Sequence, residues 1–134
     1  MTERYFTAEE ANEALATLRP LAEKLVAHRR AHQEAQGARA ELTGRIAGNG
    51  GAVDVRQLGE LEEEMNREAA ALARCVARIQ ELGVLVKDLD RGLVDFPALR
   101  GDEEVLLCWQ VGESEVAYWH GLEEGFAGRR PLPL

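Results

Sequence analysis

The fold is decided by residues 18–82, LRPLAEKLVAHRRAHQEAQGARAELTGRIAGNGGAVDVRQLGELEEEMNREAAALARCVARIQEL. On each side of a glycine-rich break, mainly apolar residues recur in alternating steps of three and four. This is the spacing of a coiled-coil seam, the row of residues along which one helix packs on another. The break, Gly48-Asn49-Gly50-Gly51, is unfavourable in a helix and predicts a turn. The two seams are Leu18, Leu21, Leu25, His28, His32, Ala35, Arg39, Leu42 and Ile46, then Leu58, Leu61, Met65, Glu68, Leu72, Cys75, Ile79 and Leu82.

The two seams mirror each other about the glycine-rich break. The residue numbers of the matching positions have a constant sum, so that Leu21 is matched with Ile79 and His32 with Glu68. Two antiparallel helices meet layer by layer in this way. The sequence therefore predicts an antiparallel helical hairpin over residues 20–83, with arms that reach roughly 40 Å. Gly83 is expected to cap the end of the second helix.

His28 and His32 lie four residues apart on one helix face, a spacing that can hold a metal ion. Two arginines stand between them and would repel a dication. We therefore expect a polar layer in which His32 pairs with Glu68 and fixes the helix register.

The N-terminal segment carries a helix start and a helix breaker. Thr7-Ala8-Glu9-Glu10 has the pattern of a capping box, which predicts a helix from Ala8. Pro20 lacks an amide hydrogen and predicts a break, which gives a short helix over 8–18 and a long one over 20–47. The aromatic pair Tyr5-Phe6 is expected to pack on the C-terminal module, because no other aromatic residue occurs before Phe96.

The C-terminal third predicts a small antiparallel sheet. Candidate strands cover 84–89, 92–97, 105–111 and 115–120, with the second ended by Pro97 and with Arg100-Gly101-Asp102 as a turn. Residues 125–131 have no periodicity and predict an irregular tail. The expected fold class is α+β: a short N-terminal helix, a long antiparallel hairpin and a β-meander. We expect a single domain over 1–134, with parts at 1–19, 20–83 and 84–134.

Composition excludes several function classes. The chain has 134 residues, with 16 basic and 24 acidic side chains and a net charge of −8, which disfavours a nucleic-acid partner. The sequence contains no apolar run long enough for a membrane span, and its N-terminus is too acidic for a secretory signal. Two cysteines 33 positions apart do not form a disulfide framework, so we expect a cytoplasmic protein.

Cys108, Glu113 and His120 are the candidate metal ligands, because sulfur, oxygen and nitrogen together suit Zn²⁺ or another divalent ion. If Gly112-Glu113 is a two-residue hairpin loop, Cys108 and His120 lie on opposite faces of the sheet and cannot share a metal. Only a three-residue loop or a bulge places them on one face. The structural alternative is a cysteine that packs as a small apolar residue and a histidine at the end of a strand.

Three further groups of residues have structural explanations. Carboxylates at 88, 90, 95, 103 and 104 form a potential acidic cluster, which strand-edge protection is sufficient to explain. Arg129-Arg130 is expected in an exposed tail, where it would bind phosphate weakly. Trp109 and Trp119 are expected in the core rather than on a docking surface.

Nearly the whole chain resembles a known prokaryotic family. The residues that carry the resemblance are YFTAEEANEAL at the start, the LRPL step, the GNGG tip and the ending GVLVKDLDRGLVDFPALR…EVLLCWQVGESEVAYWHGLEEGFAGRRPL. They are similar to the family catalogued as domain of unknown function 2203. The resemblance implies a small cytoplasmic bacterial protein, and it implies no activity, substrate or partner.

Three hypotheses follow for function. The first is a non-catalytic interaction or scaffold protein, more consistent with the residues than an enzyme, whose hairpin forms a homodimer through a stripe of small residues. The second is a divalent-metal-binding protein or metal-dependent enzyme that uses Cys108 and His120. The third, by analogy of shape alone, is a coiled-coil factor that enters the RNA polymerase channel, although only Asp54 lies close to the tip. The stripe consists of Ala22, Val26, Ala69, Ala73, Val76 and Ala77.

Overall fold

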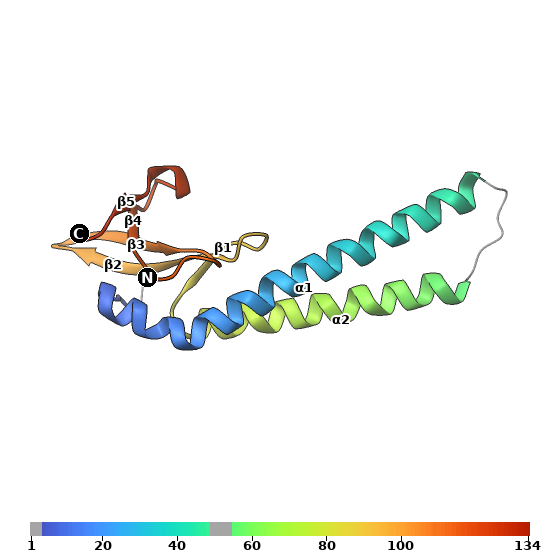
Figure 1. The fold of residues 1–134 in the computed structure, drawn as a ribbon, viewed down its shortest axis with the longest axis horizontal. Coiled ribbons are helices and arrows are strands. Elements are labelled where there is room, and N and C mark those ends of the chain that lie inside the picture. Colours follow the sequence, from blue (N-terminus) through green and yellow to red (C-terminus); the bar gives the residue numbers. More distant parts are fainter. Residues whose placement is uncertain (1–3, 49–54) are drawn as a thin grey trace.

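A computed structural model describes residues 4–48 and 55–134 and combines two long helices with one antiparallel sheet. Helix α1 covers Ala8–Gly48 and α2 covers Val55–Glu81. The two helices run antiparallel and extend as a hairpin away from the sheet (Figure 1). The predicted α+β class and the helical hairpin are confirmed. Residues 49–51 of the predicted turn, and Asp54, lie outside the described residues.

Helix α1 begins with the predicted capping box. The Thr7 amide donates to Glu10 Oε1 at 3.0 Å, and the Glu10 amide donates to Thr7 Oγ1 at 3.1 Å. The bond from the Thr7 amide favours the charged carboxylate and is the first cause that lowers the pKa of Glu10. The Thr7 and Glu10 amides, which have no partner within the helix, are thus both hydrogen-bonded, and this explains why the helix begins at Ala8.

Pro20 does not divide α1, so the prediction of two helices over 8–18 and 20–47 is wrong. A proline inside a helix costs about 3 kcal/mol through the lost hydrogen bond and the ring clash. Leu18 and Leu25, on either side of Pro20, are completely buried. Burial of each leucine contributes about 1.5–3 kcal/mol, which is sufficient to offset that cost. Figure 1 shows the axis of α1 bending in its blue N-terminal part, as expected for a helix that contains proline.

The register of the helix pair differs from the prediction in one polar layer. His28, not His32, pairs with Glu68, and the distance from Nδ1 to Oε2 is 2.6 Å. The predicted seam repeats every 3.5 residues, whereas a straight helix repeats every 3.6 and its contact face therefore drifts. Ala22 accordingly replaces Leu21 among the fully buried residues of α1. Helix α2 contributes Cys75 and Ile79 to the buried face, as predicted.

The C-terminal residues form one five-stranded sheet in which each strand pairs antiparallel with the next, as a meander requires. Helix α2 ends just before Gly83, whose φ of +86° is the left-handed conformation expected of its capping role. The predicted turn at Arg100-Gly101-Asp102 is also present. The strands are β1 at Leu85–Asp88, β2 at Leu93–Arg100, β3 at Glu103–Trp109, β4 at Tyr118–Gly121 and β5 at Arg130–Pro131.

Strand β2 continues through Pro97, so the prediction that this proline ends the strand is wrong. Strand β1 pairs with β2 only along Leu93–Asp95, so Pro97 lies beyond its reach. There the Phe6 amide donates to the Pro97 carbonyl at 2.7 Å. The nitrogen and the carbonyl of one residue face the same side of an antiparallel strand, so the missing N–H removes no bond to β3.

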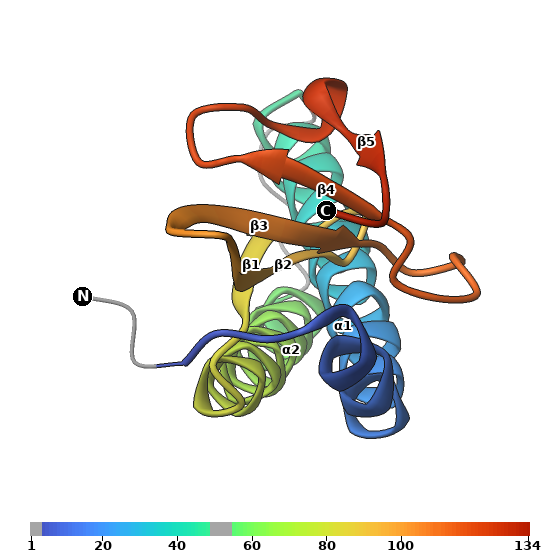
Figure 2. The same ribbon diagram turned by 90° about the vertical axis from the view of Figure 1, so that its left-hand side faces the viewer.

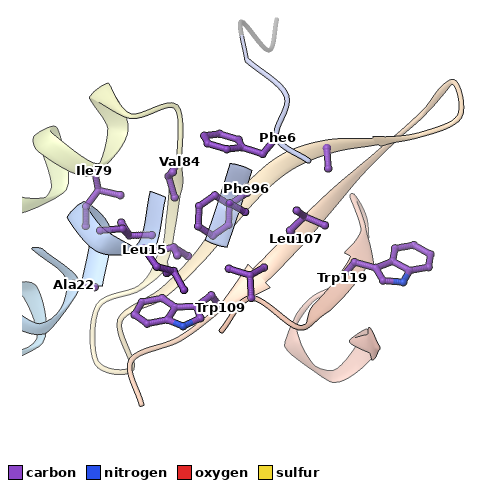
Figure 3. Packing of buried hydrophobic residues seen from close by; sticks show 14 of the residues in the cluster. Phe6, Leu15, Ala22, Ile79, Val84, Phe96, Leu107, Trp109 and Trp119 are labelled. Carbon is purple, nitrogen blue, oxygen red and sulfur yellow. The ribbon is translucent and has the colours of Figure 1, made fainter. Parts of the chain in front are cut away.

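The core fills the space between the base of the hairpin and one face of the sheet (Figures 2 and 3). Trp109 is completely buried and Trp119 nearly so, as predicted. Phe6 packs edge-on against Phe96, with ring centroids 5.2 Å apart, whereas Tyr5 is 39% exposed. The predicted docking of the N-terminal segment on the sheet is therefore confirmed for Phe6 alone. Figure 2 shows both helices on one side of the sheet, with β4 and β5 farthest from them.

Candidate functional site

The second face of the sheet, turned away from the helices, carries Cys108 and His120. Strand β3 ends at Trp109 and β4 begins only at Tyr118, so the strand predicted over 115–120 starts three residues later than expected. The connection is longer than the two-residue loop that would separate the two residues, and longer than the three-residue loop considered as the alternative. In the observed register, Cys108 is opposite Tyr118 and His120 is opposite Leu106. Because opposite and alternate residues share a face, the longer loop places Cys108 and His120 on the same face.

Asp95 of β2 is the third member of this cluster, in place of Glu113. It lies opposite Cys108 in the register, and its Oδ1 is 3.1 Å from His120 Nε2. Ligand atoms of Asp95, Cys108 and His120 all lie within 4.8 Å of one another. The three residues are only 2%, 0% and 3% exposed. We call this group the sheet cluster.

The hydrogen bonds of His120 fix the roles of its ring nitrogens. Nδ1 lies 2.8 Å from the carbonyl oxygen of Gly121, which only accepts, so Nδ1 carries a proton and donates. Nε2 is thereby directed at Asp95 and the interior of the sheet cluster. A histidine held by a backbone carbonyl in this way is the usual arrangement of a metal ligand, although buried structural histidines also adopt it.

Cys108 is a protonated thiol in this environment. Burial is the main reason that its pKa is raised to about 12, and the negative charge of Asp95 adds to the effect. A nucleophilic cysteine needs the opposite, a pKa lowered by nearby positive charge. Without a bound cation, burial therefore keeps Cys108 as a thiol at neutral pH rather than as the thiolate that a nucleophile needs.

Glu113 does not join the sheet cluster, so its prediction as a metal ligand is not supported by the geometry. Its two carboxylate oxygens each lie 2.7 Å from Arg129 NH2, and one also accepts from the Gln110 amide at 2.9 Å. Arg129 itself lies between the rings of Tyr118 and Phe126, at 4.1 and 4.6 Å from their centroids. Glu113, in the loop between β3 and β4, therefore holds the C-terminal segment in place through Arg129.

The C-terminal segment is mostly exposed, as the sequence predicts, but it is not irregular. It contains a 3₁₀ turn at Phe126–Gly128 and strand β5, and the side chain of Arg129 is only 11% exposed. Arg130 binds both oxygens of Glu124 at 2.9 and 3.0 Å. Both arginines are thus paired with carboxylates, which leaves them poorly suited to bind phosphate.

The predicted acidic cluster is dispersed in the structure. Asp88 accepts from the Asp90 and Arg91 amides and holds the turn after β1. Asp90 pairs with Arg29 of α1 at 3.1 Å. Asp95 alone among them joins the sheet cluster. The sequence does not predict its place beside Cys108 and His120, because that place depends on the register between β2 and β3.

A shallow apolar groove lies on the hairpin, with a volume of about 370 Å³. Its floor is formed by the part of the predicted small-residue stripe that belongs to α2. Ala22 of that stripe is instead buried in the core, which corrects its assignment to a dimer surface. The groove is lined by Arg29, His32, Ala69, Leu72, Ala73, Val76, Ala77, Gln80 and Leu89.

No described helix has the length and apolar character that crossing a membrane requires. Residues 4–132 match the family model DUF2203, described as an uncharacterized conserved protein. Searches of curated proteins and of solved structures found no match to the chain.

Proposed function

The chain belongs to the DUF2203 family, and we propose that it is a non-catalytic interaction protein whose helical hairpin forms a homodimer. The observation that carries this proposal is the apolar groove on α2. A second copy of the same chain occupies the groove, so that two hairpins form a four-helix bundle.

The groove has the composition of a helix-packing surface. Ala69, Ala73 and Ala77 follow one another every four residues on a single face of α2, and all three are exposed. Alanine side chains allow a neighbouring helix to approach closely. Leu72 and Val76 are half-buried beside them and widen the apolar surface. A neighbouring helix can therefore pack closely along this row of alanines.

The surface is complementary to itself. If a second α2 packs antiparallel about a two-fold axis at Ala73, Ala69 of one copy meets Ala77 of the other. The same operation brings Asn66 opposite Gln80, and both of these amide side chains are exposed. Small side chains then face small ones at the centre, and amides face amides at the ends. This symmetry favours a second copy over an unrelated partner.

The chemistry of Cys108 supports a non-catalytic role. It lies beside a histidine and an aspartate, as a nucleophilic cysteine would, but its thiol pKa is raised to about 12 rather than lowered. With all three residues buried, the sheet cluster meets protein atoms rather than a substrate.

Light scattering coupled to size exclusion tests the proposal. One chain has a mass of 14.8 kDa, and we expect twice that value. Ala73→Glu places two carboxylates together at the two-fold axis and should give the mass of one chain. Ala40→Glu, at an exposed alanine of α1, is the matched control and should remain dimeric. A wild-type mass of one chain at every concentration, or a dimer that tolerates Ala73→Glu, would contradict the proposal.

A further inference from the structure

We propose that Asp95, Cys108 and His120 bind a zinc ion that joins the three central strands of the sheet. One ligand comes from each of β2, β3 and β4. The site lies on the face turned away from the hairpin and shares no residue with the dimer groove. Zinc binding at this site is therefore expected to need no contact from a second copy.

The donor set selects the class of metal. Thiolate sulfur, imidazole nitrogen and carboxylate oxygen together suit Zn²⁺, whereas Mg²⁺ and Ca²⁺ prefer oxygen ligands alone. One thiolate and one carboxylate also balance the two positive charges of the ion. A neutral assembly is the form in which these groups are least costly to bury.

The distances fit after small side-chain movements. Zinc bonds of about 2.0 Å to nitrogen and oxygen and about 2.3 Å to sulfur place tetrahedral ligands about 3.3–3.6 Å apart. Nε2 of His120 and Oδ1 of Asp95 are already 3.1 Å apart, and all three ligand atoms lie within 4.8 Å. The fourth ligand of the tetrahedral zinc ion is the second Asp95 oxygen or a water molecule.

The surroundings of the cluster prepare the imidazole for a metal. The bond from His120 Nδ1 to the Gly121 carbonyl leaves Nε2 to face the ion. The register fixes the other two ligands, because Asp95 and Cys108 are directly opposite each other in the β2–β3 ladder. Since the ligands are buried, the ion stabilises the sheet instead of exchanging substrate.

Cobalt binding gives a direct test, because a thiolate bound to Co²⁺ produces a charge-transfer absorption in the near ultraviolet. Protein stripped with a chelator is titrated with Co²⁺, and Zn²⁺ is then added. We expect one Co²⁺ per chain, the charge-transfer band, and loss of the band when Zn²⁺ displaces the cobalt. Zn²⁺ should also raise the thermal midpoint of the stripped protein.

Matched variants identify the ligands. Cys108→Ser should abolish the band and weaken Zn²⁺ binding by more than about 100-fold, since outer-shell partners alone are worth about 10–100-fold. Cys75→Ser removes the other buried cysteine and should leave both signals intact. Glu113→Gln should likewise leave binding unchanged, whereas Asp95→Asn should weaken it. Circular dichroism establishes that each variant is folded.

Two results would overturn the proposal. The first is wild-type protein that binds no stoichiometric Co²⁺ or binds it without the charge-transfer band, a measurement that needs no variant. The second is a band that persists in Cys108→Ser or disappears in Cys75→Ser, which would place the metal elsewhere. In either case the sheet cluster is a buried hydrogen-bonded group that needs no cation.

Discussion

Gly92 gives the sharpest test of how the sheet is placed on the hairpin. It lies in the turn between β1 and β2 with a φ of +62°. A Cβ atom added there would lie 2.5 Å from Val111 Cγ2 and 2.9 Å from Val26 Cγ2. These two contacts come from the loop after β3 and from α1, so Gly92 is where three parts of the chain meet. Valine is stiff about χ1 and cannot easily turn its methyl groups away.

Gly101 is the matched control, because its φ is +63° and a Cβ added there meets nothing within 4 Å. Both substitutions to alanine carry the left-handed penalty of about 1–2 kcal/mol. Only Gly92→Ala adds overpacking, which costs about 1–3 kcal/mol. The difference between the two variants therefore isolates the clash. It should lower the free energy of unfolding of Gly92→Ala by about 1–3 kcal/mol relative to Gly101→Ala.

Urea unfolding followed by tryptophan fluorescence measures this difference, because Trp109 and Trp119 are both buried. The protein concentration must be equal throughout, since the stability of the proposed dimer would depend on it. Adding Val111→Ala to Gly92→Ala should recover part of the loss, with a coupling energy of about 1 kcal/mol. Equal midpoints and slopes for the two glycine variants would refute the close packing of this turn against α1.

Three further predictions concern Phe6, the Cys108 thiol and the His28–Glu68 pair. Phe6→Ala empties a 2%-exposed site and should cost about 3–5 kcal/mol in urea unfolding; a loss below about 1 kcal/mol would contradict the docking of this residue. The pKa of Cys108 is raised from 9.0 to about 12, so the folded metal-free protein holds the thiol proton more tightly than the unfolded chain. The stability that the protonated Cys108 thiol contributes to the fold is fully present below pH 9 and is lost as the pH rises toward 12. We expect the free energy of unfolding to fall by about 1 kcal/mol between pH 8 and 10. Cys108→Ser should flatten this part of the pH profile, and an unchanged slope would be evidence against the shift. His28→Ala should cost about 0.5 kcal/mol, since its pair with Glu68 is partly exposed, and His32→Ala should cost less; the reverse order would restore the predicted register.

The hairpin could be predicted from sequence because its signal is repeated over many residues. Seam residues such as Leu18, Leu25 and Ile79 recur at helical spacing, and a single irregular position does not change the pattern. The partner of Glu68 is not predicted correctly because His28 and His32 lie one helical turn apart on the same face, and periodicity does not fix the axial offset of two helices. Periodicity therefore predicts the element and its direction better than the contacts within it.

Pro20 and Pro97 are expected to end their elements, but packing with distant segments keeps both elements continuous. Pro20 costs α1 one hydrogen bond, but buried leucines on either side keep the helix continuous. Pro97 costs β2 nothing in the ladder with β3, because its nitrogen faces the side covered by Phe6. Neither context is visible in the residues adjacent to the proline, since each depends on segments elsewhere in the chain.

The sheet cluster could be predicted only in part. Residue type alone indicates Cys108 and His120 as a pair, but the length of the loop between their strands, which decides whether they share a face, is not predicted correctly by a two- or three-residue hairpin. Asp95 became the third member through strand register, while Glu113, nearer in sequence, is held by Arg129. Residue type suggests candidate ligands, but the pairing of strands decides which carboxylate lies beside them.

The proposed dimer and the proposed zinc site share no residue, so each proposal can fail without affecting the other. The dimer groove depends on α2 and its contacts with α1, whereas the sheet cluster depends on the pairing of β2, β3 and β4. Chelator-stripped protein still presents Ala73 on the groove, and Ala73→Glu leaves Cys108 in its place on β3. Because the core lies between the hairpin and the sheet, a metal that stabilises the sheet supports the base from which the hairpin extends without forming any part of the dimer interface.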